Sequence, residues 1–356
     1  MAANITYHEQ TDMDNIRKLR EVLKTLPAFA KDYFRAIEPT TSTKTRISYA
    51  YDIRIFFQFL ISQNPSLAKI GIPNLNVSVL DQLKPIDIEE YMEYLKLYDS
   101  PNDQTTITNG ERGLKRKISS LRSFYTYYYK RQAIETNPVQ LVDMPKIHDK
   151  AIIRLDAGET AALLDYIEHC GDQLTGQRKA YYEKTKLRDL AIVTLLLGTG
   201  IRVSECVGLD EEDIDYRNNG IRLIRKGGSE MVVYFGPEVE KALKDYLEAR
   251  KAISPLEGHE HALFYSTQRK RIGVQAVENL VKKYARAITT TKKITPHKLR
   301  STYGTTLYQE TGDIYLVADV LGHKDVNTTK KHYAAMDDAR RRKAATAIRL
   351  REDYED

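Results

Sequence analysis

Hydrophobic residues recur at helical spacing in several separate stretches of the chain. Threonines and a serine at residues 40–45 precede the first stretch, where helix N-caps are expected, so we predict that a helix begins near residues 42–44. Apolar side chains then recur every three or four residues as far as Leu60. The same period returns in residues 86–98 and 113–132, the second of which also carries a dense basic face. These patterns predict a helical first half.

The character of the chain changes near residues 137–152, where two prolines and mixed polar residues predict an extended linker. A helix capped by Asp156 follows, and then an apolar helix that ends at Gly198 and Gly200. Two runs rich in β-branched residues flank the sequence RKGGSE, which predicts a β-hairpin. Helical patterns then continue toward the C-terminus. The second half is therefore predicted to be helical with a small antiparallel sheet.

These changes of pattern suggest a division of the chain into segments. The first forty residues are polar and mixed in charge, and residues 64–85 contain three prolines and little periodicity, as a connection or insertion would. We expect a mainly α protein of two domains with these boundaries: an N-terminal extension at 1–40, a helical domain at 41–136, a linker at 137–152, a mixed α/β domain at 153–338 and a C-terminal tail at 339–356.

Composition narrows the class of protein. The 356 residues include 55 Lys and Arg against 49 Asp and Glu, and 42% are hydrophobic, which is enough for two packed domains. Two cysteines are too few for a disulfide framework and fit a reducing compartment. The apolar runs are shorter than the roughly 18 residues of a membrane span. We therefore expect a cytoplasmic protein without a membrane partner, whose excess of positive charge permits nucleic-acid binding without establishing it.

Four segments of the second half carry polar side chains that a packed core would not require. Arg202 follows the glycine end of the apolar helix, where it either faces a cleft or satisfies helix carbonyls. Lys226 lies beside two glycines at the hairpin tip, where the backbone can approach a ligand closely, although an exposed turn lysine is by itself the better explanation.

The third and fourth segments lie near the C-terminus. His297 and Arg300 are three residues apart on a helix expected after Pro296, so they share one face and suit a phosphate; a solvated helix face is the ordinary alternative. His323 follows Leu-Gly, and Tyr333 comes ten residues later. Composition does not distinguish Tyr333, because the chain contains 24 tyrosines.

Taken together and in order, these segments resemble the tyrosine recombinases, or phage-type integrases, including the Xer proteins. The residues that carry the resemblance are Arg202, Lys226, the sequence His297-Lys298-Leu299-Arg300, the sequence Leu321-Gly322-His323, and Tyr333. The basic helices of the first half look like the family's core-binding domain, and residues 137–146 look like its interdomain linker. The resemblance implies a helical core-binding domain followed by a mixed α/β catalytic domain.

The resemblance also implies a mechanism. Six residues would be catalytic: Arg202, Lys226, His297, Arg300, His323 and Tyr333. The tyrosine would attack the DNA phosphate and form a 3′-phosphotyrosyl intermediate, the arginines would bind the non-bridging oxygens, and the lysine would protonate the leaving 5′-oxygen. Glu205 would hold one of the cationic groups, unless it is an ordinary surface glutamate. Strand exchange would proceed through a Holliday junction without metal, ATP or another cofactor.

Two departures from the family pattern keep other functions open. Ser301 follows Arg300 where many members have histidine, and the interval from His323 to Tyr333 is one residue longer than the commonest one. Neither Tyr315 nor Tyr354 competes well for the role of the nucleophile. A DNA-binding or architectural protein that has lost catalysis is one alternative, and a type IB topoisomerase is a less favoured one.

Basic residues on both domains are candidates for DNA contacts, and together they predict a C-shaped clamp around double-stranded DNA. The candidates are Thr43, Lys44, Arg46, Lys115, Arg116, Lys117, Arg122, Lys130, Lys282 and Lys283. Taken singly, each is better explained as a solvated surface charge. We expect residues 339–350 to form an amphipathic helix. In the family such a segment docks on a neighbouring protomer, so the resemblance implies a homo-tetramer on two DNA sites. Accessory proteins would be further partners. A tail folded back on its own domain is the alternative.

Overall fold

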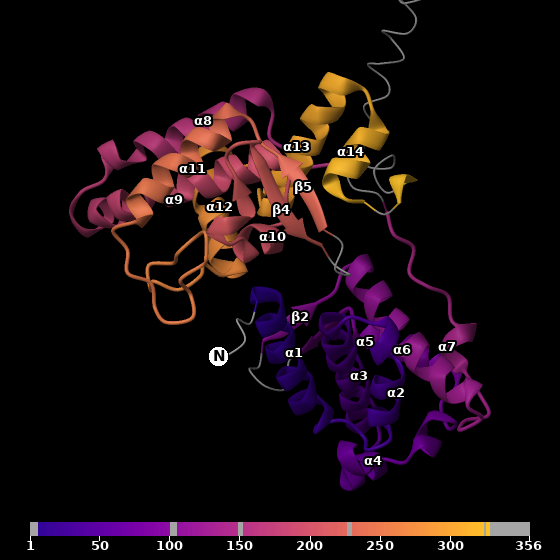
Figure 1. Ribbon diagram of the computed structural model, residues 1–356. Coiled ribbons are helices and arrows are strands. Elements are labelled where there is room, and N and C mark those ends of the chain that lie inside the picture. The colour runs from indigo at the N-terminus through magenta and orange to yellow at the C-terminus, as the bar shows by residue number, and fades with distance from the viewer. Residues whose placement is uncertain (1–5, 100–104, 149–151, 226–229, 324, 328–356) are drawn as a thin grey trace, which may run out of the picture. The chain divides into compact units, whose positions relative to one another are not determined.

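The computed structural model describes residues 6–99, 105–148, 152–225, 230–323 and 325–327, and these form helices and two small antiparallel sheets (Figure 1). The chain divides into two compact units, residues 1–150 and 151–356. The division falls inside the linker predicted at 137–152. Among the described residues, no helix combines the length and the hydrophobicity that a membrane span requires.

Unit 1 consists mainly of helices. In chain order its described elements are α1 (Tyr7–Leu23), α2 (Ala30–Ala36), η1 (Glu38–Thr40), α3 (Thr43–Gln63), α4 (Pro65–Ile70), η2 (Ile72–Asn74), η3 (Val77–Leu80), α5 (Pro85–Tyr94), β1 (Leu97–Asp99), β2 (Thr106–Thr108), α6 (Glu111–Lys130) and α7 (Pro138–Leu141). Strands β1 and β2 pair in antiparallel fashion, with Leu97 opposite Thr108.

The centre of unit 1 is an aromatic core between α3 and α6. Helix α3 begins where the sequence predicts it, because Ser42 is its N-cap and accepts a hydrogen bond from the Thr45 amide. Phe56 and Phe57 of α3 and Phe124 of α6 are fully buried. The rings of Phe57 and Phe124 pack in a T-shaped arrangement with their centroids 6.1 Å apart. The apolar periodicity of these two helices therefore corresponds to their buried faces.

The described part of the first forty residues, from residue 6 onward, contributes to this core rather than forming a separate extension. Leu19 of α1 and Tyr33 and Phe34 of α2 are buried in the same cluster as α3 and α6. The Tyr128 hydroxyl of α6 donates a hydrogen bond of 2.8 Å to the Phe29 carbonyl. Apolar residues at helical spacing within a polar segment are enough to make it part of the domain.

The proline-containing stretch 64–85 also packs on unit 1. It forms α4 and two short 3-10 helices, and it buries Leu75, Val79 and Leu80. The Tyr125 hydroxyl donates a hydrogen bond to the Leu80 carbonyl at 3.3 Å. The prolines therefore divide this connection into short turns without removing it from the core.

Unit 2 is built around a long helix whose C-terminal half is largely buried. In chain order its described elements are α8 (Ala157–His169), η4 (Cys170–Gln173), α9 (Gly176–Thr199), α10 (Val203–Gly208), η5 (Glu211–Asp213), β3 (Ile214–Asp215), β4 (Gly220–Ile224), β5 (Glu230–Tyr234), α11 (Pro237–Arg250), α12 (Val274–Ile288), α13 (Pro296–Thr311) and α14 (Ile314–Leu321). Helices α8, α11 and α13 all pack against α9.

Local patterns explain the elements that surround the site. Asp156 and Glu159 form a reciprocal capping box at the start of α8, as the sequence predicts. The end of α9 is mostly apolar and largely buried, for example at Ile192 and Leu196. It stops at Gly200, whose φ of 62° is in the left-handed region.

The predicted hairpin is present as β4 and β5, and β3 adds a third antiparallel strand on the other side of β4. Ile221 and Leu223 of β4 face the core, whereas Arg222 and Ile224 are exposed. This alternation is typical of a sheet with one solvated face.

Candidate active site

Arg202 is held at the start of α10 by a buried carboxylate. Glu205 accepts a hydrogen bond of 2.7 Å from the Arg202 backbone amide and one of 2.8 Å from Arg202 Nη1. The Glu205 side chain is 7% exposed, whereas that of Arg202 is 41% exposed. Glu205 is thus a buried partner of Arg202 rather than a surface glutamate, and it fixes a guanidinium group that remains accessible to a ligand.

Arg300 connects the ends of two helices. It lies one turn after His297 on α13, is 5% exposed, and donates hydrogen bonds to the carbonyls of Gly200 and Leu321. These carbonyls follow α9 and end α14, where helix carbonyls lack partners within the helix. His297 is exposed on the first turn of α13. The predicted pair therefore shares one helix, with the histidine at the surface and the arginine buried.

The turn that precedes His323 is the point on which the arginines converge. Gly322 ends α14 with a φ of 59°, and its carbonyl accepts a hydrogen bond of 3.2 Å from Arg202 Nη2. The Leu321 carbonyl accepts from Arg300. Guanidinium groups at the carbonyl end of a helix also interact favourably with its dipole. The structure thus brings Arg202, Arg300 and His323 to one place, although they are far apart in the sequence.

Arg225 is a third arginine at this turn, and the sequence patterns did not single it out. It donates a hydrogen bond of 2.9 Å from Nη2 to the Val320 carbonyl. One indication was available, because Ile221 and Leu223 alternate toward the core and Arg225 continues that alternation. Burial lowers the pKa of Arg225, and the Glu205 carboxylate opposes that change.

Two of the predicted catalytic residues, Lys226 and Tyr333, lie outside the described residues. Lys226 directly follows Arg225 in the sequence, between the two strands of the hairpin. Their assignment stays a prediction from the resemblance.

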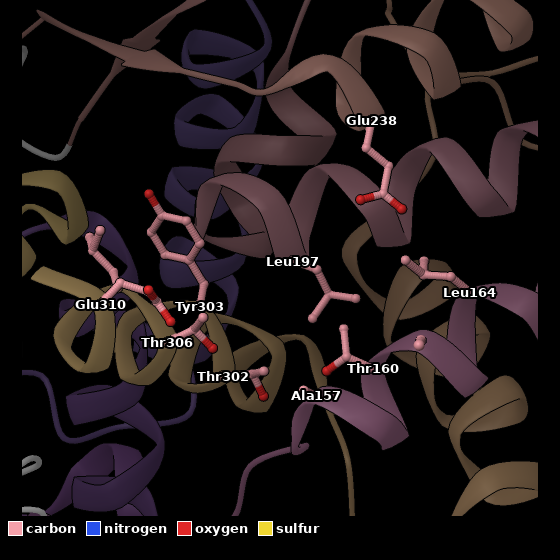
Figure 2. Close-up of a pocket in the computed structure, with 11 residues that line it drawn as sticks. Ala157, Thr160, Leu164, Leu197, Glu238, Thr302, Tyr303, Thr306 and Glu310 are labelled. Carbon is pink, nitrogen blue, oxygen red and sulfur yellow. The ribbon is translucent and has the colours of Figure 1, made fainter.

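A pocket of about 490 Å³ lies close to the site (Figure 2). Side chains of α8, α9 and α13 and the start of α11 line it, among them Leu164, Leu197 and Leu307, with Glu238 and Glu310 as acidic members. Tyr303 connects this pocket to the active site, because its ring packs against Gly200 so closely that a Cβ there would lie 2.3 Å from Tyr303 Cδ1.

The candidate DNA contacts at the start of α3 differ in their exposure to solvent. Lys44 is exposed, whereas Thr43 and Arg46 are buried. Arg46 Nη1 forms an ion pair of 3.0 Å with Glu38. Arg46 therefore has an acidic partner within unit 1.

The basic residues of helix α6 also differ in their exposure to solvent. Lys117 is buried, and its Nζ lies 3.3 Å from Oδ1 of the buried Asp52, which also accepts hydrogen bonds from Arg116. Arg122 donates hydrogen bonds to the Val139 and Val142 carbonyls. By contrast, Lys130 is exposed and Lys115 is half-buried. Several basic residues of this helix thus hold unit 1 together.

On unit 2, Lys282 and Lys283 of α12 are both exposed. The ammonium group of Lys283 lies 4.3 Å from the centre of the Tyr284 ring, at a cation–π distance.

Comparisons with known proteins agree with this geometry. Residues 154–340 match the Phage integrase family. The tyrosine recombinase XerC of Caldanaerobacter subterraneus subsp. tengcongensis is 33% identical over 337 residues, which cover 91% of this chain and 87% of that protein. The tyrosine recombinase XerS of Streptococcus equi subsp. zooepidemicus is 30% identical over 335 residues, with coverages of 88% and 93%.

Solved structures share the fold. The Tn1549 transposon integrase in complex with transposon right end DNA matches with a TM-score of 0.62 and 21% identity, over 89% of this chain and 98% of that one. The XerH site-specific recombinase bound to a palindromic difH substrate matches with a TM-score of 0.61 and 18% identity, over 85% and 79%. The chain therefore belongs to the phage integrase family of tyrosine recombinases and is a site-specific DNA recombinase.

Proposed function

We propose that Tyr333 cleaves DNA by attacking the scissile phosphate. The tyrosine oxygen forms a bond to phosphorus, the bond to the 5′-oxygen breaks, and the DNA retains a 3′-phosphotyrosyl end. Because the new bond preserves the energy of the phosphodiester, a 5′-hydroxyl of another strand can reverse the step without ATP, and two such exchanges pass through a Holliday junction.

The other catalytic residues have roles that follow from their chemistry. Arg202 and Arg300 bind the non-bridging oxygens, whose charge increases in the transition state. His297 accepts the proton of the Tyr333 phenol, and Lys226 donates a proton to the departing 5′-oxygen. His323 donates a hydrogen bond to the phosphate. The observation that carries this assignment is the convergence of Arg202 and Arg300 on the turn before His323, with His297 one helical turn from Arg300.

DNA binding is proposed for the accessible cationic residues of both units, which together would close around a duplex. The exposed or half-buried members of the predicted set are Lys44, Lys115, Arg116, Arg122, Lys130, Lys282 and Lys283. Contacts to phosphate would supply most of the affinity and make it dependent on salt. We keep the cytoplasm as the proposed location, since the substrate is DNA.

We also propose a tetramer on two DNA sites, joined by residues 339–350. Ala344, Ala347 and Ile348 of this segment are apolar, and residues 340–343 are Arg-Arg-Arg-Lys. The pocket lined by Leu164 and Leu307 has matching properties, because its acidic members Glu238 and Glu310 complement that basic run. Docking of the segment from a second copy of the chain would couple assembly to cleavage, and accessory proteins would act on the assembled complex.

Covalent trapping tests the proposed chemistry. Wild-type protein and Tyr333→Phe are incubated with nicked duplexes taken from DNA that flanks the gene, and protein–DNA adducts that resist denaturant are collected. We expect the adduct in wild type and in Tyr315→Phe, an exposed tyrosine of α14 that serves as the matched control, and no adduct in Tyr333→Phe. An adduct in Tyr333→Phe would assign the nucleophile elsewhere. Binding that depends on salt without any adduct would favour a catalytically silent DNA-binding protein.

A further inference from the structure

Arg225 is a buried arginine whose position calls for an explanation. Its side chain is 10% exposed, and its Nε lies 3.9 Å from Glu205 Oε1. This Nε is buried and has no hydrogen-bond acceptor among the described residues. A buried guanidinium group costs free energy unless charges and hydrogen bonds compensate it. The burial of Arg225 by itself is therefore not expected to stabilise the fold.

The packing of Arg225 connects it to the catalytic turn. Its guanidinium group lies against Gly322, where a Cβ would come within 1.3 Å of Arg225 Nη1. The Val320 carbonyl accepts its Nη2 hydrogen bond, and the Gly322 carbonyl accepts from Arg202. Arg225 and Arg202 thus hold two carbonyls of one short turn that are two residues apart, and Arg300 holds the Leu321 carbonyl between them.

The charges at this turn are unequal. Arg202, Arg225 and Arg300 contribute three positive charges. Glu205 contributes one negative charge within its ion pairs to Arg202 and Arg225, and the exposed Asp319 of α14 contributes a second one that also acts on Arg225. Without Arg225, the Glu205 carboxylate would be compensated by Arg202 alone, and the positive potential available to a bound phosphate would be smaller. An environment with more buried cations than anions suits an anionic ligand.

We propose that Arg225 is a positioning residue for DNA cleavage: it shares the Glu205 carboxylate with Arg202 and holds the Val320–Gly322 turn, so that the Arg202 guanidinium remains available to the scissile phosphate. This inference rests on the proposed function, in which Arg202 binds that phosphate. Arg225 itself acts through Arg202 and the turn.

A neutral substrate separates this role from a purely structural one. In a methylphosphonate, a methyl group replaces one non-bridging oxygen, so the scissile phosphate carries no charge and needs less positive potential. Cleavage rates are measured on a normal duplex and on one with a single methylphosphonate at the scissile position. We expect Arg225→Gln, which keeps a hydrogen-bond donor but loses the charge, to cleave the normal duplex about 10- to 100-fold more slowly than wild type. On the methylphosphonate we expect a loss of less than about threefold.

Two control variants define the outcomes. Arg222→Gln changes an exposed arginine of β4, the strand that precedes Arg225. Arg222 pairs with Asp213, and the variant should cleave both duplexes as wild type does. Arg202→Ala is the benchmark for a residue that binds the phosphate. If Arg202→Ala loses as much on the neutral duplex as on the normal one, the proposed phosphate contact fails. If Arg202→Ala is relieved on the neutral duplex and Arg225→Gln is not, only the inference about Arg225 is overturned.

Thermal melting of each variant verifies folding. If Arg225→Gln does not fold, Arg225→Lys carries the test, because it keeps the charge and loses the planar fork. Its ratio of the two cleavage rates should stay within about threefold of the wild-type ratio. A larger change in that ratio would show that the charge of Arg225 is not what matters.

Discussion

Replacement of Gly322 by alanine tests how tightly the catalytic turn is packed. Gly322 has a φ of 59°, a left-handed conformation that costs a residue with a Cβ about 1–2 kcal/mol. The new Cβ would also overlap Arg225, since it would lie 2.2 Å from Arg225 Cζ. The guanidinium group would have to move and lose its hydrogen bond to the Val320 carbonyl.

The expected fall in melting temperature is the sum of two costs, the lost hydrogen bond of Arg225 and the strain of the left-handed backbone. Loss of a hydrogen bond from a charged donor costs about 1.5–3 kcal/mol. For a unit of this size, 1 kcal/mol lowers the melting temperature by about 2–4 °C, so the displaced arginine alone should account for roughly 3–12 °C. The backbone term adds about 2–8 °C by the same conversion.

Differential scanning calorimetry of the full chain measures this change. Gly258→Ala is the matched control, because Gly258 also has a positive φ, of 79°, but has no atom within 4 Å of the added Cβ. The difference between the two variants isolates the contact with Arg225. Equal shifts in melting temperature for Gly322→Ala and Gly258→Ala would refute the reasoning.

A double-mutant cycle gives an independent check. In a background of Arg225→Ala the steric conflict is gone, so Gly322→Ala should then cost only as much as Gly258→Ala. An undiminished effect of Gly322→Ala in that background would mean that the Cβ meets something other than Arg225.

Three further predictions concern other parts of the chain. Asp52→Asn should lower the free energy of unfolding of unit 1 by about 3–5 kcal/mol, because it leaves the buried Lys117 ammonium without its carboxylate partner. Urea unfolding measures this change, and a decrease below about 1 kcal/mol would contradict the buried pair. Lys282→Ala should weaken DNA binding equally for all DNA sequences and reduce the steepness of log K against log salt concentration by about 0.9. Fluorescence anisotropy at several salt concentrations measures this slope, and an unchanged slope would show that Lys282 does not contact a phosphate. Ile348→Asp should leave binding to one duplex intact, but it should reduce the assembly of two DNA sites at least about tenfold in native gels. The reason is that burial of a charged side chain against apolar pocket residues is unfavourable. Unchanged assembly would refute docking of the tail in the pocket.

The sequence by itself determined the helices and the hairpin that carry the site. Ser42 and Asp156 are N-caps where the patterns predict them, and the two runs expected to form the hairpin pair as β4 and β5. These features depend on contacts within a few residues, such as a side chain that accepts a nearby backbone hydrogen bond, and those contacts are encoded locally. The order of the motifs was also sufficient to indicate the family.

Only the tertiary structure decided which charged residues face inward. Lys117 resembles its exposed neighbours in sequence, yet it is buried against Asp52, which is 65 residues away in the chain. Arg225 acquires its role from Glu205 and Gly322, which three separate elements bring together. The segment before residue 40 joins the core because α1 packs against α3. A charge or an apolar stripe acquires its function from partners distant in the sequence, and no local pattern specifies those partners.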